Sequence, residues 1–394
     1  MARSVVVGGV GMVPFRKPGD SKAYYEMGAE AARMALADAK LDYSAVRQAY
    51  VGYVYGDSTS GQRALYEVGM TGVPIVNVNN NCSSGSTALF LARQAVESGM
   101  VDCAIAVGFE QMQPGALGEV WTDRPSSLGR FNAAADDWAG HAEIPLTLRF
   151  FGGAGAEYLD RYGAKVDLFA KVKAKASRHA AANPLALLRN VVTTEEVLES
   201  KPIWPGVLTR LMACPPTCGG AAAVVMSEEF ARRNGVDTQV RIKGQTMMTD
   251  LPGTFGHRSM IDLVGSEMAR AAAEQLYKET GTSPEDVDVC ELHDCFAQNE
   301  VFTYEALGFC KEGEATAFVE KGDNTYGGQV VTNPSGGLLS KGHPLGATGL
   351  AQCYELTQQL RGAADRRQVE GARLALQHNL GIGGAVVCTM YEKH

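Results

Sequence analysis

The stretch ELHDCFAQNE, residues 291 to 300, places a histidine, an aspartate and a cysteine side by side at positions 293 to 295. Neighbouring side chains on a strand point to opposite faces, so these three can converge only where a strand ends and the backbone turns. The run VDVC before them predicts such a strand. His293 is suited to donate a hydrogen bond to a substrate oxygen, and Cys295 offers a thiol, whose alternative is a redox or buried spectator role. Asp294 is expected to orient a neighbour or a loop.

A second candidate group is Cys82, within PIVNVNNNCSSGSTALFLARQ. PIVNV predicts a strand and helical periodicity begins after Gly85, so Cys82 is expected at a strand-to-helix turn. The free N–H groups of a helix N-terminus lower the pKa of a thiol and can hold a developing oxyanion. A cysteine that only fills the core is the alternative. The polar, glycine-rich surroundings favour a nucleophile.

His343 occupies the matching turn of a second, similar segment. The stretches CSSGSTAL from Cys82 and HPLGATGL from His343 each open a helix that an apolar run follows, and the helical stretches EMGAEAARMALADA and GSEMARAAAEQLY repeat upstream in the same order. Chance similarity is the alternative, but two matched pairs favour an internal duplication. Equivalent helix N-termini of two related halves can meet at their interface. This would bring the imidazole of His343, a base for the thiol, to Cys82.

Two further patterns concern oxyanions and metals. The glycines of HNLGIGGAVV, at positions 381, 383 and 384, predict a tight turn whose N–H groups could cradle an oxyanion. The pair Cys214 and Cys218 in CPPTC has no second pair at the spacing of metal ligands, so a structural role is favoured over zinc. No metal and no resident cofactor are expected.

The order of strand and helix signals that must position these groups predicts an α/β fold of two similar halves. We expect the first half, with Cys82, at residues 1–120 and the second at residues 245–394. The segment 121–244 between them differs in texture and predicts an inserted loop and helical region, ending in a return strand from GGAAAVVMS.

The bulk composition narrows the function classes. The 394 residues are 45% hydrophobic and 20% charged, as in a globular protein with a sizeable core. The net charge of -8, without a basic stripe, argues against nucleic acid as a partner. No run approaches the ~20 apolar residues that span a bilayer, and the glycine-rich start predicts a strand rather than a signal peptide. Nine scattered cysteines indicate a reducing compartment, the cytoplasm, or the peroxisome in a eukaryote although the terminal S-K-L address is absent.

Taken together, these motifs resemble those of the thiolases, and within that family those of the sterol carrier protein-type branch. NNNCSSGSTAL resembles the nucleophile motif of the family, NPSGGLLSKGHPLGATG its G-H-P motif, and HDCF the version that this branch has of the N-E-A-F motif. The resemblance covers nearly the whole chain and is weakest in the middle. Most thiolases carry a second cysteine in a C-x-G motif, where this chain has Gly381-Ile382-Gly383.

The resemblance implies a fold of five layers (αβαβα) and a homodimer or homotetramer. It implies an acyltransferase of lipid metabolism and fatty acid β-oxidation that cleaves 3-ketoacyl-CoA with coenzyme A, a substrate rather than a cofactor. By this analogy Cys82 accepts the acyl group, His343 activates it, and Cys295 replaces the missing second cysteine as acid and base. His293 would build one oxyanion hole, and the N–H groups of Cys82 and Gly383 the other.

Two rival functions remain: a retro-aldolase on steroid side-chain CoA esters, and a non-catalytic lipid carrier or scaffold of the same fold. The first needs no acyl-enzyme thiol, and a chain ending at His394 is expected to lack the carrier domain of some relatives. Arg130, Arg258 and Lys341 are candidates for the coenzyme A phosphates, each with an ordinary surface charge as its alternative. Length, branching or sterol nature of the acyl chain is not readable from the sequence.

Overall fold

The computed structural model describes residues 3–115, 118 and 121–394. Its first five-stranded unit consists of β1 (Val5–Met12), β2 (Gln48–Gly52), β3 (Ile75–Val78), β4 (Cys103–Glu110) and β7 (Gly219–Ser227). The second consists of β8 (Val240–Met248), β9 (Val289–Glu291), β10 (Val331–Thr332), β11 (Leu374–Gly381) and β12 (Ala385–Lys393). One residue pair, Val6 with Arg241, joins β1 to β8, so these ten strands of the described residues form one sheet. A small separate ribbon pairs β5 (Pro202–Trp204) with β6 (Leu208–Thr209).

The two units have the same topology. Along the sheet the order is β3-β2-β4-β7-β1 in the first and β10-β9-β11-β12-β8 in the second. In both, the first two pairings are parallel and the last two antiparallel. This repeat confirms the two similar halves predicted from the matched sequence pairs. The boundaries at residues 120 and 244 stay predictions, and residue 120 lies outside the described residues.

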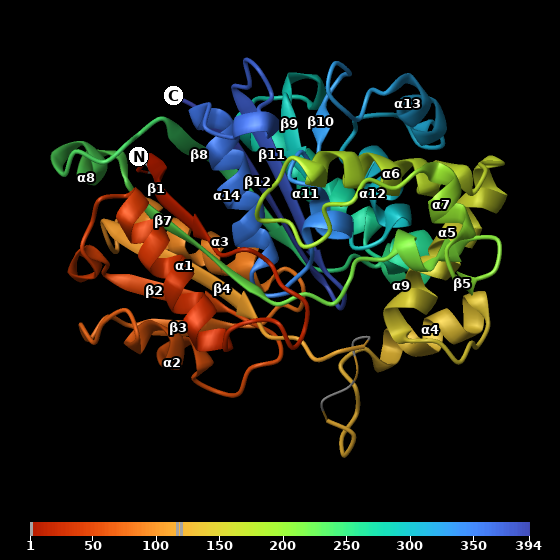
Figure 1. The fold of residues 1–394 in the computed structure, drawn as a ribbon, viewed down its shortest axis with the longest axis horizontal. Coiled ribbons are helices and arrows are strands. Elements are labelled where there is room, and N and C mark those ends of the chain that lie inside the picture. The colour runs from red at the N-terminus through yellow and green to blue at the C-terminus, as the bar shows by residue number, and fades with distance from the viewer. Residues whose placement is uncertain (1–2, 116–117, 119–120) are drawn as a thin grey trace.

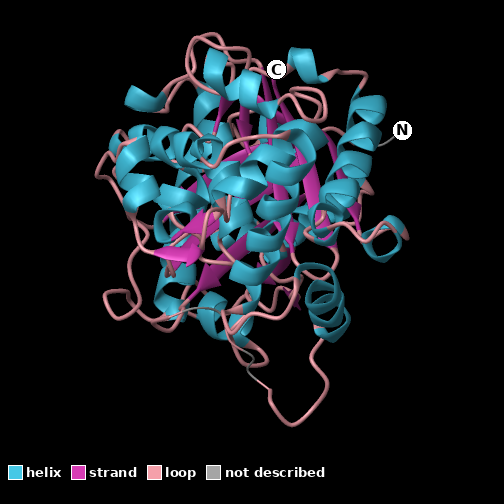
Figure 2. Cartoon of the chain, turned by 90° about the vertical axis from the view of Figure 1, so that its right-hand side faces the viewer, coloured by secondary structure: helices cyan, strands magenta, loops and turns pink. Residues whose placement is uncertain are grey.

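Helices cover both faces of the sheet (Figures 1 and 2). Those associated with the two units are α1 (Tyr24–Asp38), α2 (Ser60–Tyr66), α3 (Ser84–Glu97), α8 (Glu228–Arg233), α9 (Gly253–Gly256), α10 (Met260–Leu263), α11 (Ser266–Thr280), α12 (Ala297–Ala306), α13 (Ala315–Lys321) and α14 (Thr348–Arg361). Helix α1 packs on β1, β4 and β7, and α11 packs on β8 and β12. Helices α3 and α14 contact each other and strands of both units, so they form a central layer between the two five-stranded units. The chain therefore has the predicted α/β class and five layers.

The apolar core has three parts that match these layers. One lies between α1 and the first unit, one around α3 and α14, and one between the second unit and its outer helices. The central pair can approach closely because its contact residues are small: a Cβ on Gly85 would lie 2.6 Å from the carbonyl oxygen of Gly346. This contact brings the start of α3 and the turn before α14 together, which are the sequence positions of Cys82 and His343.

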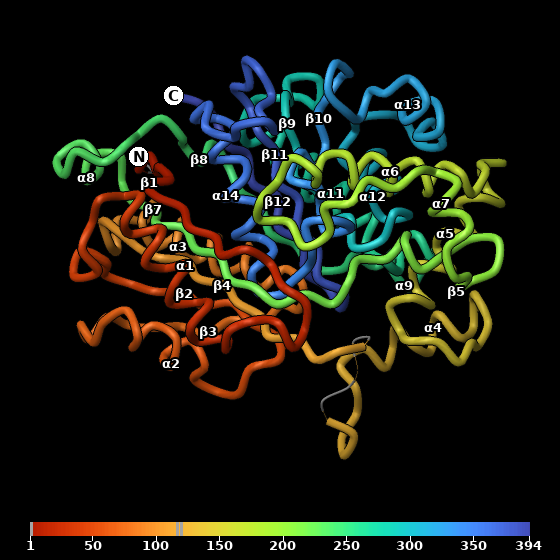
Figure 3. The backbone as a smooth tube through the Cα atoms, viewed as in Figure 1, coloured from red at the N-terminus to blue at the C-terminus, as the bar shows by residue number. Residues whose placement is uncertain are grey.

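The middle segment contributes α4 (Gly129–Ala139), α5 (Leu146–Tyr162), α6 (Asp167–Ala181) and α7 (Thr194–Glu199). These helices lie beside the second unit, where α5 and α6 both contact α12 (Figure 3). The return strand predicted from GGAAAVVMS is β7, which pairs with β1 and β4. Within the described ranges, no helix has both the length and the apolar character needed to cross a membrane.

Candidate active site

Cys82 lies in the turn between β3 and α3, as its sequence predicts. The turn is made by Asn81, whose φ of 51° is in the left-handed region that asparagine tolerates. The Asn81 amide donates to the carbonyl oxygen of Ile382 at 3.0 Å and so joins this turn to the β11–β12 hairpin. Cys82 is only 7% exposed, yet it lines a cavity of about 960 Å³ together with the hairpin residues 381–385. The thiol is therefore nearly buried, in the wall of a space large enough for a substrate.

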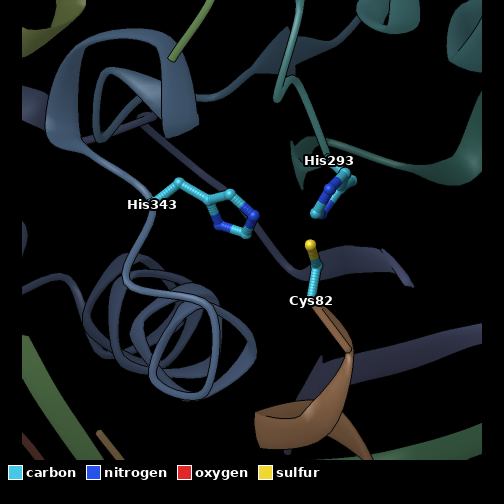
Figure 4. A group of neighbouring side chains, drawn as sticks. All are labelled: Cys82, His293 and His343. Atoms are coloured by element: carbon cyan, nitrogen blue, oxygen red, sulfur yellow. The ribbon is translucent and has the colours of Figure 1, made fainter. Parts of the chain in front are cut away.

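His293, Asp294 and Cys295 lie in the turn that connects β9 to α12, as the sequence predicts. The imidazole of His293 points toward Cys82, and that of His343 approaches from the other side (Figure 4). The three residues each bring one nitrogen or sulfur atom to within 4.8 Å of the others: Cys82, His293 and His343. The imidazole rings of the two histidines are nearly perpendicular, at 87°, and their centroids are 5.0 Å apart. Groups separated by 261 sequence positions thus meet.

His343 follows the five-residue turn Gly337–Lys341. The buried carboxylate of Asp294 accepts hydrogen bonds from the backbone N–H groups of Leu338 and Leu339, at 2.7 and 3.4 Å. Asp294 thus holds the turn that leads to His343, which confirms that it orients a loop. The backbone N–H of His343 itself donates to the hydroxyl of Thr217 at 3.1 Å.

Burial controls the protonation of these groups. It raises the pKa of the Cys82 thiol, and the charges of Cys214 and Glu110 raise it further. The prediction that the helix N-terminus lowers this pKa is therefore wrong for the resting protein, because desolvation outweighs it. Burial also lowers the pKa of His343 to about 3. A neutral thiol beside a neutral imidazole can pass its proton only as the sulfur attacks an electrophile.

The second thiol, Cys295, is 6% exposed. Burial raises its pKa, and the neighbouring groups Cys214, Cys82 and Asp294 raise it further. The backbone carbonyl of Cys295 accepts a hydrogen bond from the N–H of Cys214, the first cysteine of the CPPTC motif, at 2.9 Å. The second cysteine of that motif, Cys218, donates its thiol proton to the carbonyl of Met112 at 3.5 Å. The CPPTC cysteines thus have separate partners. Of the four proposed side chains, Cys82 is the one that lines the cavity.

The β11–β12 hairpin explains why residue 381 is a glycine. A Cβ at Gly381 would lie 2.2 Å from the carbonyl oxygen of Asn80 and 2.9 Å from the hydroxyl of Ser83. No larger side chain fits between the hairpin and the Cys82 turn unless one of them moves. The C-x-G cysteine that the resemblance leads one to look for has no room here. Gly383, with φ 99°, lines the cavity beside Cys82.

The three cations proposed for coenzyme A do not line the cavity. Lys341 is 1% exposed and its ammonium contacts the carboxylate of Glu291 at 3.0 Å, so its proposed contact with coenzyme A is wrong. Arg258 is paired with Asp137 at 2.9 Å, and the guanidinium of Arg130 lies 3.9 Å over the ring of Phe255. The cationic side chain among the described lining residues is Arg124, which no motif marked.

Sequence reasoning also missed two residues that support the site. Glu110, buried at the end of β4, accepts hydrogen bonds from the N–H groups of Val54, Tyr55 and Gly346 at 3.0 to 3.1 Å, so it ties the turn after His343 to the first unit. Asn379, on β11, has its amide nitrogen 3.0 Å from Nδ1 of His293. Its place in HNLG, directly before the glycine turn, was the one available signal.

Comparison with known proteins agrees with this architecture. The thiolase N-terminal domain family model matches residues 5–186, and the thiolase C-terminal domain-like model matches residues 254–390. The chain therefore belongs to the thiolase family. Within it, the relatives described next place the chain in the sterol carrier protein-type branch.

Sterol carrier protein 2 of Rattus norvegicus is 52% identical over 392 residues, which cover 98% of this chain and 72% of that protein. Non-specific lipid-transfer protein-like 2 of Caenorhabditis elegans is 45% identical over 396 residues, covering 98% and 96%. Benzoylsuccinyl-CoA thiolase subunit BbsB of Thauera aromatica is 34% identical over 387 residues, covering 97% and 96%.

Two solved structures confirm the predicted thiolase fold. The Ltp2-ChsH2(DUF35) aldolase superposes with a TM-score of 0.83 at 22% identity, covering 99% of this chain and 98% of that one. Human mitochondrial 3-ketoacyl-CoA thiolase superposes with a TM-score of 0.74 at 17% identity, covering 99% of both chains.

Proposed function

We propose that the chain is an acyltransferase that cleaves a 3-ketoacyl-CoA with coenzyme A, releasing acetyl-CoA or propionyl-CoA and a shortened acyl-CoA. The observation that carries the proposal is the meeting of the Cys82 thiol with the imidazoles of His293 and His343, all within 4.8 Å, beside a cavity of about 960 Å³. A thiol, a base and a hydrogen-bond donor are the groups that acyl transfer through a thioester requires.

In the first half-reaction, the thiol proton of Cys82 passes to His343 as the sulfur attacks the 3-keto carbon. The C2–C3 bond then breaks, and its electron pair leaves with acetyl-CoA as an enolate, while the acyl group stays on Cys82 as a thioester. His293 and the newly protonated His343 donate hydrogen bonds to the enolate oxygen. Cys295 delivers its proton to the enolate carbon and becomes a thiolate. The N–H groups of Cys82 and Gly383 hold the oxyanion of the acyl carbonyl.

In the second half-reaction, the Cys295 thiolate takes the proton of a fresh coenzyme A thiol. The coenzyme A sulfur attacks the thioester carbonyl, and the Cys82 sulfur leaves and recovers its proton from His343. All four side chains then have their starting protonation states. We propose Arg124, which lines the cavity, as a contact for a phosphate of coenzyme A.

Two rival functions use the same fold. One of the structural neighbours is an aldolase by name, and its likeness at 22% identity concerns the fold alone. A retro-aldolase needs no acyl-enzyme thiol, and a lipid carrier needs neither base nor donor at a sulfur. The grouping of Cys82 with two histidines therefore favours acyl transfer over both.

The experiment that tests the proposal is to trap the acyl group. A 3-ketoacyl-CoA labelled in its acyl portion should leave the label on Cys82, and coenzyme A should discharge it. Cys82→Ser should neither form this adduct nor turn over, because a hydroxyl lacks thiolate character, while Cys310→Ser, at a partly buried cysteine outside the site, should do both. Cleavage without an adduct would favour the aldolase, and binding without cleavage the carrier.

The proposal extends to the setting of the reaction. All nine cysteines lie in the described residues and are free thiols, which supports a reducing compartment such as the cytoplasm. The family relationship favours a homodimer or a homotetramer. It also favours a role in the degradation of fatty acyl chains by β-oxidation. Sedimentation of the purified chain and a screen of 3-ketoacyl-CoA esters of different length and branching test these points.

A further inference from the structure

We infer that the two histidines at Cys82 are held in opposite neutral tautomers, and that Asn379 is the positioning residue that fixes the tautomer of His293. The inference deepens the proposed function and rests on it for its catalytic consequence. The tautomers themselves can be measured without turnover.

The hydrogen-bond chain that orients Asn379 begins at Gln377. The amide nitrogen of Gln377 lies 2.7 Å from the carbonyl oxygen of Gly349, which can only accept, so the Gln377 amide has one allowed orientation. Its oxygen accepts from the hydroxyl of Tyr391, in agreement with this orientation. The second proton of the nitrogen goes to the hydroxyl oxygen of Ser86 at 2.8 Å, which lies nearer than the side-chain oxygen of Gln352 at 3.3 Å.

Ser86 passes this orientation on. Because its oxygen accepts from Gln377, its own proton is free to go to the side-chain oxygen of Asn379, at 2.8 Å. The Asn379 nitrogen then faces two acceptors, the carbonyl oxygen of Cys82 at 3.2 Å and Nδ1 of His293 at 3.0 Å. A backbone carbonyl thus fixes the amide at each end of the chain. Nδ1 of His293 must accept, so the proton of this neutral ring is on Nε2.

His343 has the reverse arrangement. Its Nδ1 lies 2.6 Å from the hydroxyl oxygen of Thr348. A threonine in a helix commonly donates its hydroxyl proton to the carbonyl four residues earlier, and the Thr348 hydroxyl lies 3.0 Å from the carbonyl of Pro344, which also accepts from the N–H groups of Ala347 and Thr348. With the Thr348 proton on this carbonyl, Nδ1 of His343 donates to the Thr348 oxygen and the lone pair is on Nε2, which is the tautomer we infer. Among the described residues, this buried Nε2 has no hydrogen-bond partner. At the same sulfur, His293 thus offers an N–H group and His343 a nitrogen lone pair.

The opposite tautomers divide the work. Nε2 of His343 can take the proton of Cys82, whereas the Nε2–H of His293 can only donate, as an oxyanion requires. Burial keeps both rings neutral by lowering the pKa of each. The same assignment disfavours a metal ion on these three residues, since a metal would need a lone pair on Nε2 of His293.

The test is ¹⁵N NMR of the resting, histidine-labelled protein, in which the shifts of the ring nitrogens report the tautomer. His293→Gln and His343→Gln variants assign the two rings among the seven histidines. The wild-type protein should show Nε2–H at His293 and Nδ1–H at His343. Equal tautomers, or Nδ1–H at His293, would overturn the inference.

Asn379→Asp is the sharpest perturbation, because a carboxylate of the same shape can only accept and so demands a proton on Nδ1 of His293. We expect the His293 signals to change to the Nδ1–H or doubly protonated pattern while those of His343 do not. We expect kcat to fall about 100- to 1,000-fold, the loss typical of one oxyanion donor. Asn183→Asp makes the same change at a buried asparagine whose amide donates to the carbonyl of Ser335, and it should leave both tautomers unchanged.

The proposed function and the tautomer assignment can fail independently of each other. If the resting tautomers are opposite but no 3-ketoacyl-CoA is turned over, the proposed function is wrong and the inference about Asn379 stands. If turnover is found and His293 carries its proton on Nδ1, or Asn379→Asp leaves the His293 signals unchanged, the inference is wrong and the proposed function stands.

Discussion

The buried carboxyl of Glu110 should make the stability of the protein depend on pH. It holds the N–H groups of Val54, Tyr55 and Gly346, and burial raises its pKa from the ordinary 4.5 to about 7 although these donors act in the opposite direction. The perturbation is Glu110→Gln, which keeps the shape of the side chain and removes the titration.

The magnitude follows from the two pKa values. Since the folded value lies above the unfolded one, the folded chain binds the proton more tightly. The stability that this proton contributes is fully present below pH 4.5 and is lost as the pH rises through about 7. A pKa difference of one between the folded and unfolded states corresponds to about 1.36 kcal/mol. Between pH 4.5 and 8, the free energy of unfolding of the wild-type protein should therefore fall by about 3 kcal/mol relative to that of Glu110→Gln. Other groups titrate in both proteins and cancel in the difference.

The assay is denaturant unfolding, followed by tryptophan fluorescence, of both proteins between pH 4.5 and 8 at one protein concentration. The difference between the two free energies of unfolding should change by about 3 kcal/mol across this range, because the wild-type protein becomes less stable relative to Glu110→Gln as the pH rises. Parallel curves would refute the reasoning, since they would mean that the three backbone donors keep Glu110 ionised throughout.

Three further predictions concern the thiols, the hairpin and the buried ion pair. Cys295→Ala should abolish exchange of deuterium into the methyl group of acetyl-CoA, and exchange at the wild-type rate would remove Cys295 as the acid and base. Gly381→Ala should destabilise the protein by about 1–3 kcal/mol and slow adduct formation, because its methyl meets the carbonyl of Asn80; unchanged rates of alkylation and turnover would show that the hairpin yields freely. Lys341→Ala should cost about 3–5 kcal/mol in a thermal or denaturant melt, because it leaves the buried carboxylate of Glu291 unpaired. A loss below about 1 kcal/mol, typical of exposed pairs, would contradict this.

The groups brought to one place were predictable because each lies in a local pattern with a meaning of its own. Cys82 and His343 occupy repeated strand-to-helix turns, and HDC follows a strand, so the topology of the repeat was enough to make them converge. The partner of His343, Thr348, is also local, five residues along the chain.

The partners of His293 were not predictable in this way. Ser86 reaches Asn379 across 293 sequence positions, and a hydrogen bond between such distant residues leaves no periodicity to read. Burial was equally invisible: the thiol of Cys82 was expected to be acidic, and Lys341 to face solvent. Each depends on how many atoms from remote segments surround it, and this is known only once the layers are packed.

The repeated topology has a consequence for the origin of the site. Two identical half-chains related by a twofold axis would carry the same side chain at both strand-to-helix turns, either two thiols or two imidazoles. A sulfur and its base can face each other across such an axis only if the two copies differ in sequence, which joining them in one chain allows. The fused chain can therefore specialise each copy separately, which no symmetric pair of identical half-chains can do.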